Sequence, residues 1–415
     1  MTTIDLIAAI LFGLALAHTF AAKTFERLAD RFPRHAGLLH FFGEVEVVFG
    51  LWAFILIVAM ALVSGGAQAL QYAESRTYTE PLFVFVIMVV AASRPVLEAI
   101  RAAIDALARL VPLRTAVVRV WLCLAVVPLL GSLVTEPAAM TMAALMLAPL
   151  VFRHGVPEWL KYAALGVLFV NVSIGGTLTS FAAPPVLMVA KTWNWDSAFM
   201  AANFGWKCAL AVVVNASAVT LMLRRHMLDD DPNAARPMPI PLPVTAIHIA
   251  FLASVVLFAH HPVIFLGLFM FFIGFTSAYD TYQNPLLLKE GLLVGFFLAG
   301  LVVLGGMQQW WLQPLVSSME PNALFFGATA LTAITDNAAL TYLGSLIEGM
   351  SDHAKYMLVA GAVAGGGLTV IANAPNPAGA ALLRDGFNDE SIGVGGLLLG
   401  ALPPTIVAML ALFLL

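Results

Sequence analysis

Two acidic motifs interrupt apolar sequence in this chain, and their residue types are those that bind small cations. The first motif contains Thr135-Glu136 and the second is Thr335-Asp336-Asn337. A carboxylate at the depth of a lipid bilayer costs roughly 2.5–3.5 kcal/mol, so it is rarely placed there without a function. The second motif puts a hydroxyl, a carboxylate and an amide carbonyl on adjacent residues, which is a hard-oxygen environment suited to Na⁺. Each acid also has a purely structural interpretation, because Asp and Glu stabilise the start of a following helix.

Two Gly- and Pro-rich stretches, 171–185 and 365–377, offer further oxygen ligands after each acidic motif. Glycine permits unwound backbone, which is tolerated at membrane depth only where it is buried in protein or lines water. We expect the amides and hydroxyls of these stretches to complete the ion shells. These residues are Asn171, Ser173, Thr177, Thr179, Thr369, Asn373 and Asn376. The alternative is a kink at which small residues let helices pack closely.

A third acidic pair, Glu44 and Glu46, stands at the start of another apolar run, one helical turn after His40. Carboxyl and imidazole groups at a membrane boundary are suited to proton access. The alternative is an ordinary interfacial helix end whose acids are solvated or paired with Arg31 or Arg34. Glu46 is the stronger candidate because it lies deeper in the apolar run.

Composition identifies an integral membrane protein. Hydrophobic residues make up 61% of the 415 residues and charged residues 11%, with a mean hydropathy of +0.93. Soluble domains are closer to one quarter charged. A net charge of −4 without a basic stripe gives no reason to expect a nucleic-acid partner. The two cysteines, Cys123 and Cys208, lie in apolar segments and are expected to be buried, without a disulfide or metal.

Enzyme signatures are missing from the sequence. It has no phosphate-binding Gly-rich loop followed by Lys-Ser/Thr, no His-Glu-x-x-His and no Gly-x-Ser-x-Gly. We therefore expect no enzyme activity, no nucleotide and no cofactor other than transported ions.

The distribution of apolar runs predicts an all-α polytopic fold with about ten transmembrane helices. Unbroken runs cover residues 4–22, 40–64, 81–99, 198–223, 243–259, 263–279, 288–306 and 391–414. The acidic motifs break segments 119–152 and 321–349, and the Gly/Pro-rich stretches break 162–191 and 356–384. If the acidic segments are re-entrant hairpins, Lys and Arg fall mainly on one side, as expected for cytoplasmic loops.

The two halves of the chain carry these features in the same order, with Glu136 matched to Asp336. We therefore predict two inverted-topology repeats, 1–223 and 243–415, joined by a polar cytoplasmic linker at 224–242. Each repeat contains one hairpin and one discontinuous helix. The first segment has no basic residue before its apolar core, so we expect a retained helix and not a signal peptide.

Three runs of residues, 171–190, 334–341 and 372–377, resemble a bacterial family of Na⁺/H⁺ antiporters in the ion transporter superfamily. That superfamily also contains arsenite permeases and dicarboxylate and citrate transporters. The resemblance covers nearly the whole chain. It implies inverted repeats, two hairpins, a homodimer and elevator movement, with 119–191 and 321–384 in the moving part. The Ser-Asn-Thr signature of the dicarboxylate members is absent, because the tips here read Thr-Glu-Pro and Thr-Asp-Asn.

The leading hypothesis is exchange of Na⁺ for H⁺ at the inner membrane. Asp336, with Asn337 and Asn373, would bind Na⁺, and Glu136 would titrate or balance charge. Competition between the ions requires an acid whose pKa lies near the working pH. One rival is Na⁺-coupled symport of an organic or oxyanion, for which only Arg119 and helix N-termini offer positive charge. The other is a membrane scaffold that transports nothing, against which the broken helices argue.

Overall fold

The computed structural model describes residues 2–227 and 238–415, and the regular elements within these ranges are all helical. The prediction of an all-α fold is therefore confirmed. Apolar runs form the helix interiors, and polar residues mark several of the ends. Thr2 and Asp5 form a capping box at the first helix, and Ser351 caps α19 through the backbone N–H of Ala354.

The first half of the chain contains twelve α-helices. They are α1 (Thr3–Arg31), α2 (Ala36–Gly43), α3 (Val45–Ser64), α4 (Gly66–Glu74), α5 (Thr79–Ala91), α6 (Arg94–Leu110), α7 (Thr115–Val134), α8 (Glu136–Leu147), α9 (Glu158–Gly175), α10 (Pro184–Trp193), α11 (Ser197–Met200) and α12 (Trp206–Leu223). A π-helix, Ala201–Gly205, joins the last two into one continuous segment.

The second half, as far as it is described, contains nine α-helices. They are α13 (Leu242–Leu257), α14 (Pro262–Ala278), α15 (Leu288–Gly305), α16 (Gln309–Ser317), α17 (Pro321–Thr332), α18 (Asn337–Ser345), α19 (Asp352–Gly365), α20 (Asn376–Leu383) and α21 (Val394–Leu414). The predicted linker lies partly outside the described residues, between the end of α12 and the start of α13.

The predicted interruptions are present. The chain breaks at Thr135 between α7 and α8, and at residues 333–336 between α17 and α18. It also unwinds between α9 and α10 and between α19 and α20. The predicted span 81–99 is divided in the structure into two helices, α5 and α6, that meet at an angle of 63°. Pro95 in the first turn of α6 explains the bend, since proline cannot continue a preceding helix.

Among the described residues, six helical segments are long and apolar enough to cross a membrane, or up to seven if α5 and α6 form one bent span. These six lie in α3, α7, α9, α11–α12, α15 and α21. Helices α13 and α14 are apolar but have only 16 and 17 residues. The predicted ten spans therefore exceed the number that helix length and composition support.

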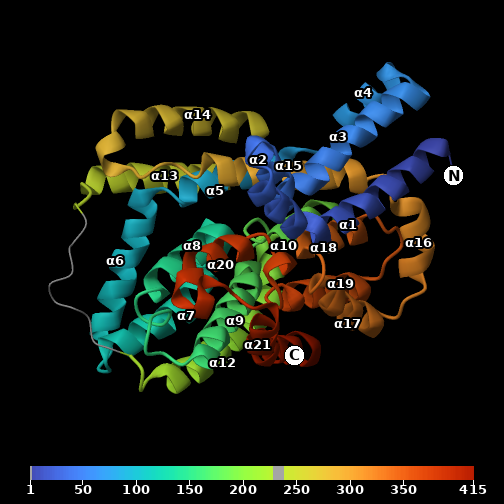
Figure 1. Ribbon diagram of the computed structural model, residues 1–415. Coiled ribbons are helices and arrows are strands. Elements are labelled where there is room, and N and C mark those ends of the chain that lie inside the picture. Colours follow the sequence, from blue (N-terminus) through green and yellow to red (C-terminus); the bar gives the residue numbers. More distant parts are fainter. Residues whose placement is uncertain (1, 228–237) are drawn as a thin grey trace.

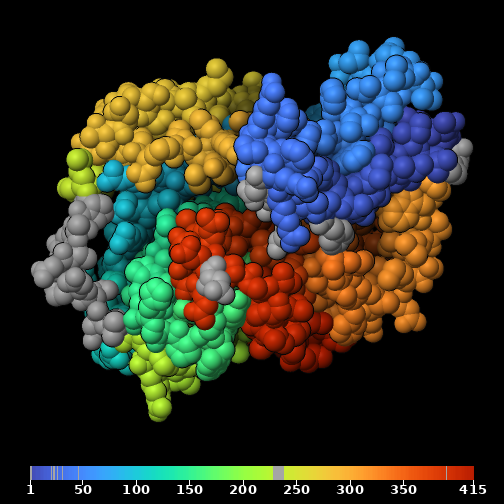
Figure 2. All heavy atoms as spheres, viewed as in Figure 1, coloured from blue at the N-terminus to red at the C-terminus, as the bar shows by residue number. Residues whose placement is uncertain are grey.

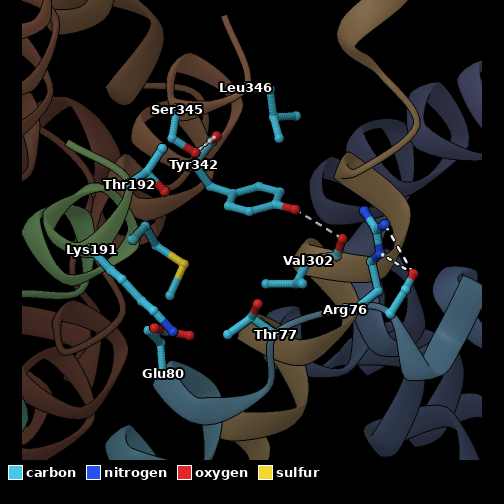
Figure 3. A pocket seen from close by; sticks show the side chains of 11 residues that line it. Arg76, Thr77, Glu80, Lys191, Thr192, Val302, Tyr342, Ser345 and Leu346 are labelled. Atoms are coloured by element: carbon cyan, nitrogen blue, oxygen red, sulfur yellow. Dashed lines mark hydrogen bonds between the residues drawn. The ribbon is translucent and has the colours of Figure 1, made fainter. Parts of the chain in front are cut away.

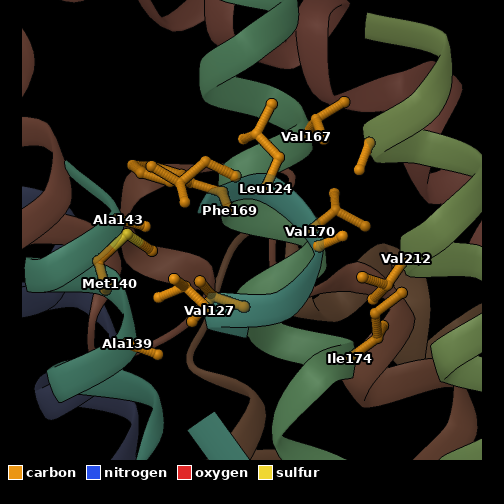
Figure 4. Packing of buried hydrophobic residues seen from close by; sticks show 14 of the residues in the cluster. Leu124, Val127, Ala139, Met140, Ala143, Val167, Phe169, Val170, Ile174 and Val212 are labelled. Carbon is orange, nitrogen blue, oxygen red and sulfur yellow. The ribbon is translucent and has the colours of Figure 1, made fainter. Parts of the chain in front are cut away.

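The helices pack around two main hydrophobic cores (Figure 1). We call the group with the first core lobe A; it comprises α7–α12 and α17–α21 and contains all four interrupted segments. Helix α18 is included because it packs on α10 and α19, although its own core side chains lie in the second core. Lobe B comprises α1–α5 and α13–α15. Figure 4 shows the centre of lobe A, where Val127 of α7, Met140 of α8 and Phe169 of α9 meet.

The lobes meet beside the acidic breaks. Val134 and Ala138 flank the first break, and Ala338 and Ala339 follow the second. All four side chains are buried in the core of lobe B, although their helices belong to lobe A. Figure 2 shows lobe B across the top of the molecule and lobe A below it. The acidic motifs therefore lie near the boundary between two separately packed bodies.

Candidate functional site

The first break is a strained backbone turn that presents a buried acid. Thr135 has φ 93° and ψ 151°, a region that is almost restricted to glycine and costs of order 1–3 kcal/mol for other residues. Pro137 follows in the first turn of α8, where its missing N–H is harmless. Glu136 is the first residue of α8 and is 0% exposed. The strain indicates that surrounding contacts fix this turn.

The Glu136 carboxylate has one hydrogen-bond donor. Its Oε2 accepts from Nδ2 of Asn373 at 2.7 Å, across the interface between the two halves of the chain. Its Oε1 is buried and has no hydrogen-bond partner. Gly176 makes room for it, because a Cβ there would lie 2.6 Å from Oε1. Arg119 does not neutralise Glu136, since its guanidinium pairs with Asp105 at 2.9 Å.

The second acid, Asp336, caps α18. Its Oδ1 accepts from the backbone N–H groups of Ala338 at 2.8 Å and Ala339 at 3.3 Å, and the residue is 9% exposed. The structural interpretation of this acid is therefore confirmed. Ion binding remains compatible with it, because a carboxylate has further lone pairs. Thr335, beside it, is partly buried.

Asn337 faces the first Gly-rich stretch. Its Nδ2 lies 3.4 Å from the Ser173 hydroxyl, which itself donates to the Val363 carbonyl at 2.8 Å. Its Oδ1 is buried without a hydrogen-bond partner. A Cβ on Gly366 would collide with both Ser173 and Asn337, so glycine is required at this approach. The unwound segments of one half thus pack on the acidic break of the other half.

Two threonines make equivalent contacts in the two halves. The Thr179 hydroxyl donates to the Ser132 carbonyl at 2.7 Å, and the Thr369 hydroxyl donates to the Ala333 carbonyl at 2.9 Å. Both threonines therefore hold the unwound chain against the end of the preceding broken helix. The main role of each hydroxyl is therefore this hydrogen bond and not cation binding. Each hydroxyl oxygen still has lone pairs that could accept a hydrogen bond or bind a cation.

These two contacts align the two breaks one residue away from the predicted match between the acids. Ser132 and Ala333 occupy equivalent positions, which makes Thr135 equivalent to Asp336 and Glu136 equivalent to Asn337. The first helical residues agree, because α8 begins at Glu136 and α18 begins at Asn337. The two acids differ by one position because Asp336 is the N-cap residue just before α18, whereas Glu136 is the first residue within α8.

Six buried side-chain oxygens at the breaks and in the unwound segments have no hydrogen-bond partner. They are Thr135 Oγ1, Glu136 Oε1, Thr332 Oγ1, Asn337 Oδ1, Asn373 Oδ1 and Asn376 Oδ1. Buried polar atoms are nearly always hydrogen-bonded, so each exception requires an explanation. All six are hard oxygen ligands of the type that small cations prefer.

Other predicted ligands have structural roles. Asn171 donates to the carbonyls of Leu124 and Val212 and accepts from Asn215, which ties α7, α9 and α12 together. The Thr177 hydroxyl donates to its own helix at Ile174. The prediction that these two side chains face the ion is not supported by their contacts. Asn376 holds the unwound chain by donating to the carbonyls of Gly366 and Thr369 and leaves only its oxygen free.

The two acids at the start of α3, Glu44 and Glu46, have different surroundings. Glu44 forms an ion pair with Lys289 of α15 at 2.7 Å, which replaces the expected partners Arg31 and Arg34. Glu46 is partly buried in the first turn of α3, close enough to Asp336 for their charges to interact. Of the two, Glu46 is the one whose charge acts on Asp336.

Sequence reasoning missed Ser132 and Thr332, which each lie four residues, about one helical turn, before an acid, Glu136 and Asp336 respectively. The Ser132 hydroxyl donates to the Gly175 carbonyl at 2.7 Å and accepts from the Leu178 N–H at 3.0 Å. The detectable signal was a hydroxyl one turn before each acid. In the described part of the chain, no three His, Cys, Asp or Glu side chains gather to hold a metal ion. A cation here would depend on amide, hydroxyl and carbonyl oxygens beside a carboxylate.

A cavity of about 280 Å³ opens between the lobes at the far ends of α10 and α18 (Figure 3). Lobe A contributes Lys191 and Tyr342, and lobe B contributes Arg76 and Glu80. The Tyr342 hydroxyl donates to the Val302 carbonyl of α15 at 3.0 Å and so links the lobes. Since α10 and α18 pack together and each begins at an interruption, the cavity lies one helix length from the acidic breaks.

Comparison with known proteins gives one family. The family model described as "Putative Na+/H+ antiporter" matches residues 3–415. No curated protein matches this chain.

Proposed function

This chain belongs to the family described as "Putative Na+/H+ antiporter", and from that premise we propose that it exchanges Na⁺ for H⁺ across the bacterial inner membrane. The apolar helices and the family together make it a multi-pass membrane transporter and not an enzyme. The observation that carries the ion specificity is the buried Glu136 carboxylate with an unpartnered oxygen.

The chemistry of exchange follows from burial. A carboxylate removed from water needs a counter-charge or a proton. Glu136 receives one amide hydrogen bond from Asn373, and Asn373 and Thr135 offer their own unpartnered oxygens nearby in the fold. Either Na⁺ or H⁺ neutralises the acid, and both cannot do so together. Competition for one carboxylate couples the two fluxes.

We assign the second set of ligands to the other break. Asn337, with Thr332 and Asn376, provides neutral oxygens there, and Asp336 adds charge at the start of α18. The sequence led us to expect Asn373 as a ligand beside Asp336. Because Asn373 is hydrogen-bonded to Glu136, we assign it to the first acid instead. Glu46 would pass protons toward Asp336, with Glu44 at the outer end of that route.

The movement we propose is of the elevator type, with lobe A sliding against lobe B. Three features support it: the separate cores, the small alanine side chains at their boundary, and the placement of all ion-ligand candidates except Glu44 and Glu46 in lobe A. The similar threonine contacts support a structural repeat of the two halves. The inverted topology of the repeats and their re-entrant hairpins are part of the proposal. A homodimer and membership of the ion transporter superfamily complete this proposal.

The test uses purified protein in liposomes that contain a pH-sensitive dye. Pulses of Na⁺, Li⁺ and K⁺ are applied across a pH gradient, with Glu136→Gln run in parallel. Na⁺-evoked proton flux that is lost in the variant supports the proposal. No cation-evoked flux, in protein shown to be folded and inserted, would overturn it.

A second candidate, Na⁺-coupled symport of a small anion, is favoured by one observation. Arg76 and Lys191 both line the cavity between the lobes, against one acid, Glu80. An anion bridging the two basic groups would contact both lobes. Uptake of a labelled carboxylate or oxyanion that depends on Na⁺, without Na⁺-driven proton flux, would replace the exchange proposal with this one.

A further inference from the structure

Helix α6 differs from the helices around it in direction and composition. It bends 63° away from α5, and Figure 1 shows it running across the direction of α5, α13 and α14. One face carries Val96, Ile104 and Ala108, all buried. The other carries charged groups at helical spacing, including Arg101 and Asp105. This pattern is typical of a helix that lies in the interface plane of a membrane.

A second cavity, of about 110 Å³, lies between α6 and the helix α8 that begins at Glu136. Its rim is polar and contains Arg94 and Arg101, with one acid, Glu98, and the amide of Asn284. Its other lining residues are apolar and include Met142, Leu145 and Met146 of α8. Leu145 is 52% exposed, so the apolar side is open to the surroundings.

The polar and apolar sides of this cavity match the headgroup and the acyl chain of a phospholipid. Two guanidinium groups at an interfacial helix match a phosphate, which Arg binds in bidentate fashion. The exposed leucine and two methionines match the upper part of an acyl chain. A free phosphate would gain nothing from the apolar side, and a plain hydrocarbon would gain nothing from the rim.

The charges of this end of lobe A indicate which leaflet supplies the lipid. Arg109 lies in the last turn of α6, and Arg114 and Arg153 donate to the carbonyls of Met227 and His226. Basic residues concentrate on the cytoplasmic side of membrane proteins, where anionic lipid attracts them.

We propose that the cavity between α6 and α8 binds the phosphate headgroup of an anionic phospholipid, with an acyl chain along Leu145. The bound lipid would connect the interfacial helix to the back of the helix that carries Glu136. The proposal does not depend on which ion or solute the protein transports.

The test measures lipid retention by native mass spectrometry after equilibration with phosphatidylglycerol or phosphatidylcholine. Wild type is compared with Arg101→Gln, which removes a rim charge, and Leu145→Trp, which fills the apolar side. Arg225→Gln is the matched control, because Arg225 is an exposed arginine outside the cavity. All four proteins are checked by gel filtration, and both tested positions are exposed, so folding should be preserved.

We expect wild type and Arg225→Gln to retain phosphatidylglycerol preferentially. Arg101→Gln should lower that retention roughly fivefold, since one basic residue near an anionic lipid contributes about that factor. Leu145→Trp should lower it without changing headgroup preference. Equal retention by wild type and both cavity variants would overturn the proposal, and so would full displacement of the lipid by inorganic phosphate.

Discussion

Replacing Glu136 by Gln should remove Na⁺ binding while leaving the fold intact. Gln has nearly the same shape, and its carbonyl can still accept from Asn373 Nδ2, so the hydrogen bond at 2.7 Å has a substitute. The variant removes the charge and puts two N–H donors in the place of Oε1, where the neighbouring Asn373 and Thr135 have unpartnered oxygens. Any change in the response to Na⁺ therefore reports on the carboxylate.

The size of the effect follows from the surroundings of this group. One hydrogen bond to a charged group contributes about 1.5–3 kcal/mol. Removing an ion from water costs several kcal/mol even after the protein relaxes. With Oε1 unpartnered, the single bond from Asn373 does not offset that cost, so the charged acid needs a cation. At a Na⁺ concentration 100 times the Kd, bound Na⁺ adds about 2.7 kcal/mol to the free energy of unfolding.

The assay is thermal unfolding in detergent, with NaCl titrated against choline chloride at constant ionic strength. Wild type should gain stability with Na⁺, and this gain should weaken at low pH because protons occupy the same carboxylate. Glu136→Gln should lose the part of this gain that comes from the first break, and without Na⁺ it should be at least as stable as wild type. A variant that retains the full Na⁺ response would refute the assignment of the cation to Glu136.

Three further predictions concern the neighbouring groups. Asp336→Asn should keep the cap of α18, because Asn is as good a cap as Asp. The variant should nevertheless lose pH-dependent exchange in liposomes. Full exchange would show that the charge of Asp336 is not used. Gly176→Ala should lower Na⁺ affinity at least tenfold by displacing Glu136. Gly13→Ala is the control, since a Cβ there meets nothing within 4 Å, and it should leave Na⁺ titrations unchanged. Equal Na⁺ affinities of the two variants would contradict the close packing of Gly176 on Glu136. Burial raises the pKa of Tyr72 from 10.0 to about 12, so its bond to Val303 should stabilise the protein fully below pH 10 and be lost as the pH rises toward 12; a Tyr72→Phe variant with the same alkaline unfolding profile would count against this.

Helix positions were predictable from sequence because membrane burial leaves a strong pattern. Apolar runs of about 20 residues can only be helices where no water satisfies the backbone, and the structure has helices close to the predicted bounds of 198–223, 243–259, 263–279, 288–306 and 391–414. The first helix continues to Arg31, and the predicted run 40–64 is divided at Glu44 into α2 and α3. The breaks were predictable for the same reason, since Gly, Pro and carboxylates are costly inside such runs. The bend between α5 and α6 was missed because the predicted run 81–99 continues through Pro95, which lies in the first turn of α6.

The partners of each side chain could not be predicted in the same way. Asn171 looked like a ligand because its residue type is right, but its use in joining α7, α9 and α12 depends on Asn215, 44 residues later. The bond between Glu136 and Asn373 crosses 237 residues. The offset of one residue between the two breaks depends on whether a carboxylate caps a helix or starts it. Such details are fixed by tertiary packing, which local pattern does not encode.

The most direct test of the central claim counts the protons released when Na⁺ binds. Isothermal titration of the purified protein with NaCl, in two buffers of different ionisation enthalpy at one pH, gives this number. If Na⁺ and H⁺ compete for the carboxylate of Glu136, wild type should release about half a proton per Na⁺ bound at the pKa of the site and close to one proton well below it. Glu136→Gln should release none from this position. Na⁺ binding to wild type without proton release at any pH would contradict the account.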